Sequence, residues 1–351
     1  MRVTFFIHTP GQVHFWHRIV NELEQRGHTV NVVARQSEPI NHLLDNYGIQ
    51  NLTYGRARRT RYGKILQLPI QLIRSLGPVT RFKPDVLIGF GTIEAWIAFM
   101  LRKPCIIFDD CEPIPFFERL SWRYIASTIL TPACYQKYLG KNHVRFNGYK
   151  ELAYLRPNYF KPDPSIYNDL GITSAERFII LRFGSFEALH DVDRKGLSTN
   201  DKYQLVEKLS KYARVFISAE GNLPADLEHY KLPTSYHRIH HVLYFAHLLI
   251  GDTGTMAWEA AVLGTPTVVC ASYTRQFGNF IELEQKYGLL YCFQEAAKVI
   301  DKALALIEQP DLKEQWSIKR KRLLDDKMDV AQFMADFIEN YPQHGNPNRK
   351  A

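Results

Sequence analysis

The stretch "IGDTGTMAWEAAVLGTP", residues 250 to 266, indicates how the whole chain folds. It consists of an apolar strand end, a turn rich in Thr and Gly, and a short helix followed by Gly and Pro. This order is typical of a parallel α/β sheet, in which ligands bind beyond the carboxyl ends of the strands. One carboxylate, Glu259, stands among apolar residues of the helix. Because burying a carboxylate without a hydrogen-bonding partner costs free energy, we expect Glu259 to have such a partner.

The turn itself has the features of a diphosphate site. Thr253, Gly254 and Thr255 begin the helix, so unpaired N–H groups and two hydroxyls are available there, and Gly254 would let ligand oxygens approach the backbone. Glu259 lies about one turn deeper, where it could accept hydrogen bonds from both hydroxyls of a ribose. Asp252, at the strand end, joins these residues as a donor-binding candidate. The alternative is that Glu259 is merely exposed on a short helix.

The same strand and helix rhythm runs through most of the chain. The N-terminal part begins with a strand, "VTFFIH", a helix over Trp16–Arg26 and a second strand, "TVNVVAR". After a proline-rich stretch the pattern resumes with the strands "RFIILRFGS", "RVFISAE" and "TPTVVCA". We therefore predict an α/β protein of GT-B type, with two Rossmann-like, doubly wound domains facing across a cleft. The expected segments are an N-terminal domain over 1–150, a linker over 151–175, a C-terminal domain over 176–310, helices over 311–341 and a disordered tail over 342–351.

Composition sets wider limits. The 351 residues, 46% hydrophobic and 23% charged, are enough for two globular domains. Five cysteines without a CxxC spacing predict free thiols, not a disulfide framework or a zinc site. No signal peptide and no run of 18 apolar residues is visible, so we expect a cytoplasmic protein, peripheral at the inner face of the plasma membrane.

The net charge of +8 has a local origin. Eight Lys and Arg residues and no Asp or Glu lie between Tyr54 and Lys83. The cations alternate with Ile, Leu and Tyr, as in a segment that lies on an anionic lipid surface. Nucleic acid attracts the same charge, but no nucleic-acid module is recognisable elsewhere. The residues predicted to meet the membrane are Arg56, Arg58, Arg59, Arg61 and Lys64.

Candidate catalytic residues follow two N-terminal strands. His14 stands after the first turn, where its imidazole could take a proton from an acceptor hydroxyl, and His8 at the strand end is its competitor. Either could instead be a packed histidine. The acidic stretch "DDCEPIPFFERL" follows another strand and could orient an acceptor or share base duty, although capping of the next helix is an equal alternative. Its candidates are Asp110, Glu112 and Glu118, with Asp109 beside them.

The C-terminal domain has a second set of donor-binding candidates after its first strand. Arg182 and Ser185 at the strand end, and His190 and Asp191 in the loop, could neutralise a leaving diphosphate. Four histidines at positions 237, 240, 241 and 247 lack an ordered ligand spacing, so we expect no metal and no cofactor. The first loop, "HTPGQVHF", lacks GxGxxG, which disfavours a dinucleotide oxidoreductase.

Seven motifs in order now suggest a family. "PGQVHFW", "RGHTVNVVAR", "KPDVLIGFG", "IIFDDCE", "GYKELAYL", "ALHDVDRKG" and the opening stretch resemble an uncharacterised prokaryotic family, a domain of unknown function described as predicted glycosyltransferases. The resemblance covers roughly residues 1 to 310. Its wider relatives are the peptidoglycan N-acetylglucosaminyltransferase and the non-hydrolysing UDP-N-acetylglucosamine 2-epimerase, which have the GT-B fold.

The resemblance also implies site roles. In both relatives a Glu in the helix after the C-domain turn binds the uridine ribose, and Glu259 is similar in position. The transferase has a Gly-rich loop ending in His after its first strand, which Gly11 and His14 match without the triple glycine. It also docks on the membrane through basic and apolar residues of its N-terminal domain. The epimerase pattern departs further, because its HRxN-type loop is here His190-Asp191 and its Ser-Gly-Gly turn is Thr253-Gly254-Thr255.

These observations favour a metal-independent glycosyltransferase. It would move a sugar from a nucleotide donor, UDP-linked, to a membrane-associated or glycan acceptor in cell-surface glycan synthesis. Its partners would be the donor, the acceptor and an anionic membrane, and no nucleic acid. Two alternatives stay open: a UDP-sugar 2-epimerase that uses the acidic stretch to move a proton, and a non-catalytic protein that binds a nucleotide sugar or a membrane surface.

Overall fold

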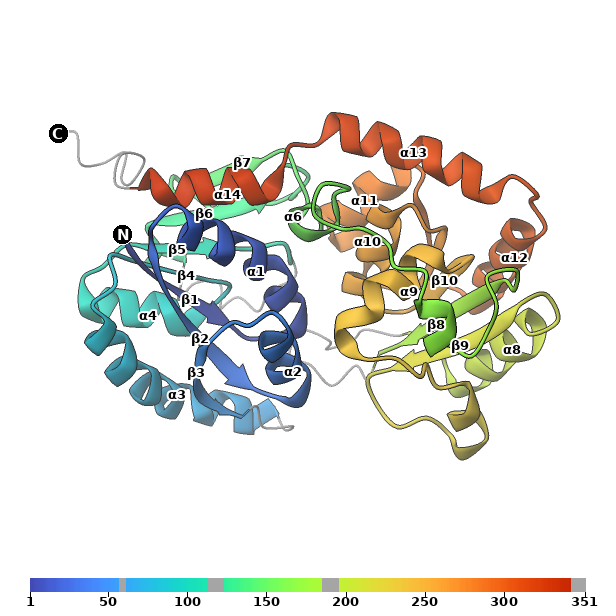
Figure 1. The fold of residues 1–351 in the computed structure, drawn as a ribbon, viewed down its shortest axis with the longest axis horizontal. Helices are drawn as coiled ribbons and strands as arrows, with labels where there is room; N and C mark the ends of the chain where they lie inside the picture. The colour runs from blue at the N-terminus through green and yellow to red at the C-terminus, as the bar shows by residue number, and fades with distance from the viewer. Residues whose placement is uncertain (57–60, 113–122, 185–195, 342–351) are drawn as a thin grey trace. The chain divides into compact units, whose positions relative to one another are not determined.

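The computed structural model describes residues 1–56, 61–112, 123–184 and 196–341, and for residues 61–67 it describes the backbone only. The chain forms two compact units (Figure 1). Unit 1 contains Met1–Tyr154 together with the described chain from Met328, and unit 2 contains Leu155–Lys327. Each unit is built on its own parallel sheet.

The sheet of unit 1 has seven parallel strands in the order β3-β2-β1-β4-β5-β6-β7. Because the order reverses between β1 and β4, their carboxyl ends form the switch point at which such sheets bind ligands. The central strands are buried on both faces, as expected of a parallel sheet. The strands are β1 Arg2–Ile7, β2 Thr29–Gln36, β3 Asn51–Arg56, β4 Val86–Gly89, β5 Cys105–Phe108, β6 Thr128–Pro132 and β7 His143–Phe146.

Helices cover both faces of this sheet. Side chains of α3 and α4 pack with Phe6, Val33 and Leu87 in one core cluster, and α1 packs against α2 and α14. The first helix begins at Pro10, six residues before the predicted start at Trp16, because proline suits the first helical position, where no N–H partner is required. The helices are α1 Pro10–Gln25, α2 Glu38–Asn46, α3 Arg61–Phe82, α4 Thr92–Leu101, α6 Leu152–Leu155, which spans the boundary between the units, and α14 Val330–Glu339.

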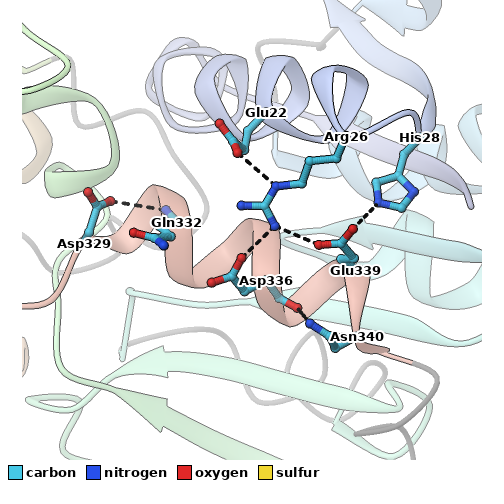
Figure 2. A network of polar contacts seen from close by, with 8 residues as sticks. All are labelled: Glu22, Arg26, His28, Asp329, Gln332, Asp336, Glu339 and Asn340. Atoms are coloured by element: carbon cyan, nitrogen blue, oxygen red, sulfur yellow. Dashed lines mark hydrogen bonds and ion pairs between the residues drawn. The ribbon is translucent and has the colours of Figure 1, made fainter.

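The last helix, α14, returns to unit 1. Its apolar side is buried there, and Phe333 stacks on Phe146. Figure 2 shows Arg26, which follows the last residue of α1, bonded to three carboxylates: to Glu22 of α1 at 2.9 Å, and to Asp336 and Glu339 of α14 at 2.6 and 2.8 Å. This network and the apolar contacts fix the C-terminal helix on the N-terminal unit.

Unit 2 has a five-stranded parallel sheet in the order β12-β11-β10-β8-β9. Its strands are β8 Phe178–Phe183, β9 Arg214–Ala219, β10 Leu248–Gly251, β11 Thr267–Cys270 and β12 Leu290–Phe293. Its α-helices are α7 Ile166–Asp169, α8 Thr199–Leu209, α9 Ile239–Phe245, α10 Gly254–Leu263, α11 Gly278–Gln285, α12 Ala296–Ile307 and α13 Leu312–Asp326. Short 3₁₀ helices occupy Ala225–Tyr230, Tyr236–Arg238 and Thr274–Gln276.

The stretch quoted first folds as its pattern predicts. Strand β10 ends at Gly251, and α10 runs from Gly254 to Leu263. Gly264 then adopts φ +81°, the left-handed conformation that ends helices. A Cβ at Gly264 would also lie 2.8 Å from the Arg320 side chain, so both the backbone conformation and the space at this position favour glycine.

All five cysteines are free. Among the described helices, none is both long and apolar enough to cross a lipid bilayer.

Candidate functional site

In unit 2 the site is built around α10. Residues Ala257–Leu263 are all buried, so the helix is apolar on every side except at Glu259. Glu259 is only 5% exposed, which excludes the alternative of a surface carboxylate. Its Oε1 lies 3.0 Å from Nε2 of His240, on α9. The partner that a buried carboxylate requires is therefore a histidine that the sequence analysis considered only as a metal ligand.

The start of α10 is open at its first turn. Thr253 is the N-cap residue, yet its hydroxyl makes no capping hydrogen bond. Its Oγ1 is buried and has no hydrogen-bond partner among the described residues. Gly254 is half-buried and Thr255 exposed. Hydroxyl and helix N–H groups together are suited to an anionic oxygen.

Asp252 has a different position from the one predicted for a ligand-binding residue. Its side chain is buried, and it accepts hydrogen bonds from the backbone N–H of Gly184 at 2.7 Å and of Leu197 at 3.2 Å. Burial raises the pKa of Asp252 to about 6, against these hydrogen bonds. The carboxylate thus ties β10 to the chain on both sides of residues 185–195.

Arg182, near the end of β8, is already engaged within unit 2. Its guanidinium donates to Ser218 Oγ at 3.0 Å and pairs with Glu220. The Arg182 Nε atom is buried and has no partner among the described residues. Two of the five N–H donors of the guanidinium are used in these contacts, so the remaining donors on Nη1 and Nη2 could still bind a phosphate.

In unit 1 the polar residues of the switch point centre on His8, directly after β1. His8 Nε2 lies 3.1 Å from Oε2 of Glu94, and Nδ1 lies 2.5 Å from the hydroxyl of Tyr54. Arg35 of β2 donates to the His8 carbonyl. The His8 side chain is 17% exposed, whereas that of Glu94 is fully buried. A carboxylate therefore orients a partly exposed imidazole whose two ring nitrogens contact Glu94 and Tyr54.

Glu94 holds this position through α4. It is the third residue of the helix, and its Oε1 accepts the N–H of Gly91 at 2.6 Å. Burial raises the pKa of Glu94, but the charge and hydrogen bond of His8 outweigh it, so the net pKa lies below the usual value. Gly89 makes room for the carboxylate, because a Cβ there would lie 2.0 Å from Glu94 Oε1. The motif "GFGTIE" contains both the glycine that makes room and the glutamate, but the sequence analysis did not assign Glu94 a role.

His14, the predicted base, lies inside unit 1. It is 4% exposed, its Nδ1 is 2.7 Å from the Tyr47 hydroxyl, and its ring stacks on Tyr154. Gly11, its predicted companion, is the second residue of α1 and half-buried. Of the two histidines weighed from the sequence, His8 is partly exposed and faces a buried carboxylate, whereas His14 is buried.

The described carboxylates of the acidic stretch are buried and engaged. Asp109 accepts the Tyr135 hydroxyl at 2.5 Å and the Cys111 N–H at 2.9 Å, and burial raises the pKa of Asp109 to about 8. Asp110 forms an ion pair with Lys150 at 2.6 Å. Glu112 accepts the N–H of Gln136 at 3.2 Å. These contacts hold the segment after β5 to the rest of unit 1.

Lys150 is a charged residue that the sequence analysis missed. Besides Asp110, its Nζ lies 3.6 Å from Glu151 Oε1, and all three side chains are buried. The motif "GYKELAYL" contains the pair, but a Lys-Glu dipeptide is by itself no signal of burial. The structure shows the reason, because β7 ends beside β6 and directs this turn toward the carboxyl ends of the sheet.

Some predicted site residues lie outside the described part of the chain, namely Glu118, Ser185, His190, Asp191, Arg58 and Arg59. Arg61 and Lys64 lie in α3, where only the backbone is described. Arg56 is described and donates to Gln36 Oε1 at 3.2 Å. Among described residues, no three His, Cys, Asp or Glu side chains are grouped as metal ligands would be.

An exposed apolar surface lies on α3 and α4, which pack side by side. Phe99 and Ile73 are 62% and 74% exposed. Arginines and a lysine accompany them, and the acidic residue of α4, Glu94, is buried. The exposed residues of this surface are Ile70, Ile73, Arg74 and Arg81 on α3, and Trp96, Phe99, Met100, Arg102 and Lys103 on and just after α4.

Two parallel, doubly wound sheets, each with polar side chains beyond its carboxyl edge, define the GT-B class of fold. Solved structures of this class match nearly the whole chain. The UDP-GlcNAc 2-epimerase of Neisseria meningitidis bound to UDP-GlcNAc matches with a TM-score of 0.64 and 14% identity, over 98% of this chain and 100% of that chain. The glycosyltransferase SsfS6 of Streptomyces sp. SF2575 matches with a TM-score of 0.59 and 12% identity, over 97% and 99%.

The chain belongs to the family described as "Protein of unknown function (DUF354)", whose model matches residues 3–342. This confirms the resemblance drawn from the seven motifs. An uncharacterised protein of Methanocaldococcus jannaschii is 25% identical over 276 residues, which are 74% of this chain and 78% of that protein. At these identities the solved structures establish the fold and leave the reaction open.

Proposed function

We propose that this protein is a glycosyltransferase that moves a sugar from a UDP-linked donor to an acceptor hydroxyl in cell-surface glycan synthesis. The observation that carries the proposal is the His8–Glu94 pair, in which a buried carboxylate orients a partly exposed imidazole at the switch point of unit 1. Glu94 accepts a hydrogen bond from the proton-bearing Nε2, so Nδ1 is the nitrogen that would take the proton of an acceptor hydroxyl, and that hydroxyl would replace the Tyr54 hydroxyl as the partner of Nδ1. The hydroxyl oxygen would then bond to the sugar's anomeric carbon as the bond to the nucleotide breaks.

Unit 2 would hold the donor. Glu259 would accept hydrogen bonds from the ribose hydroxyls, with His240 keeping the carboxylate in place. The Thr253 hydroxyl and the first N–H groups of α10 would contact the diphosphate. The same groups would stabilise the charge that develops on the leaving nucleotide.

One observation favours a second candidate, a UDP-sugar 2-epimerase. The pKa of Asp109, raised to about 8 by burial, leaves this carboxylic acid protonated at neutral pH, and an epimerase needs an acid of this kind. Asp109 is, however, buried and hydrogen-bonded within unit 1, as Asp110 and Glu112 are. The transferase is favoured because its proposed base is partly exposed, whereas Asp109, Asp110 and Glu112, the described carboxylates of the acidic stretch, are buried.

Incubation with UDP-N-acetylglucosamine separates the candidates. With acceptor lipid extracts present, a transferase releases UDP and labels the acceptor, and His8→Gln abolishes the labelling. Conversion to the manno epimer without any acceptor, retained in His8→Gln, would instead establish the epimerase. If UDP and UDP-sugars bind but neither reaction occurs with any sugar tested, the protein is a binding protein and the enzymatic proposal falls.

The acceptor is membrane-associated in this proposal, and the α3–α4 surface supports it. Exposed Phe99, Trp96 and Ile73 would enter the lipid boundary, while the adjacent cations meet anionic headgroups, each contributing about 1 kcal/mol. Flotation with phosphatidylglycerol vesicles tests this. We expect Phe99→Ser, and the triple change of Arg58, Arg59 and Arg61 to Ser, to reduce flotation, and Tyr212→Ser, at a residue that is 45% exposed on unit 2, to leave it intact. Equal flotation of all variants would refute the membrane contact.

A further inference from the structure

A cavity of about 670 Å³ opens at the carboxyl ends of β2 and β3, beside α2. It is separate from the groups assigned above, and its volume lies in the range of small-molecule sites. The residues that line it carry polar groups, among them two amides, two carboxylates, an imidazole and a guanidinium, although the stems of these side chains make most of the lining surface apolar. The lining residues are Gln36, Ser37, Glu38, Asn41, His42, Asp45 and Arg56.

The cavity is connected to the proposed base through adjacent residues. Arg35, which donates to the His8 carbonyl, immediately precedes Gln36 in β2. Tyr54, whose hydroxyl meets His8 Nδ1, lies two residues before Arg56 in β3. A molecule whose reacting hydroxyl met His8 would therefore have its remaining part near this cavity.

Two features of the lining show that it is prepared for a ligand. Asn41 Oδ1 is buried and has no hydrogen-bond partner among the described residues. Arg56 is held by Gln36 at 3.2 Å, where the β2–β3 register shifts by one residue, and it forms no ion pair among the described residues. Arg56 thus offers donors at the cavity, and since an unsatisfied buried polar atom is costly, Asn41 Oδ1 would gain a partner if its side chain turned toward a ligand there.

The charge of the lining selects the kind of ligand. Glu38 and Asp45 outnumber the single cation Arg56, so a phosphate would be repelled. A neutral ligand with neighbouring hydroxyls can donate to the carboxylates and Asn41 while it accepts from Arg56 and Gln36. We propose that this cavity is a subsite for a neutral sugar of the acceptor, next to the sugar whose hydroxyl reacts. The proposal rests on the transferase function and adds that the acceptor is a glycan and not a lipid phosphate alone.

Saturation-transfer NMR and calorimetry with a panel of neutral disaccharides test the subsite in the full chain. We expect at least one disaccharide to bind, and Asn41→Leu and Arg56→Met each to weaken it about tenfold, since each removes a hydrogen bond that the sugar cannot replace. Asn46→Leu, the same change on the same helix outside the cavity, is the control and should change the affinity less than twofold. Inorganic phosphate is titrated in the same way, to test whether the cavity binds an anion in preference to a neutral sugar.

Titration with UDP, run on every variant, separates this proposal from the one it rests on. Unchanged UDP binding shows that unit 2 is intact, and a thermal unfolding curve like that of the wild type shows that unit 1 of the variant is folded. If no disaccharide binds, if Asn41→Leu binds as well as the wild type, or if phosphate binds the cavity in preference to sugars, the subsite is refuted while the donor site stands. If UDP binds nowhere, the transferase proposal fails whatever the disaccharides do.

Discussion

Both units contain a glutamate–histidine pair at the carboxyl edge of a sheet, and the two pairs differ in exposure. In unit 1 Glu94 and His8 are 3.1 Å apart, and in unit 2 Glu259 and His240 are 3.0 Å apart. Each glutamate is on the helix that follows a strand of its sheet, β4 or β10. His8 is 17% exposed, whereas both members of the unit 2 pair have side chains about 5% exposed.

This difference suggests a division of roles. An imidazole that a carboxylate orients, and whose ring is partly exposed, can exchange a proton with a substrate. A buried pair holds the carboxylate in one place, which serves hydrogen bonding to a ligand better than proton transfer. The glycines of the two strand ends agree with this: Gly89 makes room for the Glu94 side chain, while Gly251 makes room for the backbone of Arg182.

Replacement of the accessible histidine should have the largest effect. We expect His8→Gln to lower kcat for sugar transfer by about 10²–10⁴-fold, the usual contribution of a general base, and to leave UDP affinity unchanged. Steady-state kinetics measure kcat, and calorimetry measures the UDP affinity. His14→Gln is the comparison variant, and a larger loss of kcat in His14→Gln would return the base to the residue first predicted from the sequence.

A change behind the unit 1 pair tests whether Glu94 positions His8. Gly89→Ala places a Cβ 2.0 Å from Glu94 Oε1 and so displaces the carboxylate. Since a shift of about 1 Å can cost about 10²-fold in rate, we expect a loss of that order in kcat. Gly77→Ala, where a Cβ meets no atom within 4 Å, is the control. Equal rates for the two variants would contradict the positioning role.

The buried pair should affect binding and not the chemical step. Glu259→Gln should weaken UDP about 10–100-fold, because a hydrogen bond to a charged group contributes about 1.5–3 kcal/mol. Glu314→Gln, exposed on α13, should not change the affinity. A Glu259→Gln variant that binds UDP normally but has lost kcat would reverse the roles assigned to the two pairs.

The last test concerns pH and Asp109, and its effect is on stability and not on the reaction. Because its folded-state pKa is raised from 3.8 to about 8, its contribution to stability is full below about pH 4 and is lost as the pH rises to about 8. Asp109→Asn removes this dependence. The stability of the variant relative to the wild type should therefore rise by up to about 1.4 kcal/mol per pH unit across that range, measured by urea unfolding. Parallel pH curves for the two proteins would contradict the raised pKa.

Local patterns predicted much of the fold and part of the site. Apolar runs of four to six residues between Gly, Pro and polar turns gave the strands, and "GDTGTMAWEAAVLGTP" gave α10 with its glycine end. Both features depend on residues that are neighbours in the chain. Glu259 could be singled out for the same reason, since a carboxylate among apolar residues is visible in one turn of helix.

The partners of these residues could not be predicted in the same way. Glu94 and His8 are 86 residues apart, and Glu259 and His240 are 19 apart on separate helices. Strand order brings them together, because β1 lies beside β4 in the sheet although two strands intervene in sequence. Arg26 and Asp336, 310 residues apart, meet for a similar reason when α14 returns to unit 1.

By itself, then, the sequence determined which segments become strands and helices, where the basic charge is concentrated and that a carboxylate is embedded in α10. Only the tertiary structure decided that His8 and not His14 faces a buried carboxylate, and that Asp109, Asp110 and Glu112 are engaged within unit 1. The physical reason is that periodicity records the burial of one element, whereas a pair of side chains depends on how distant elements pack.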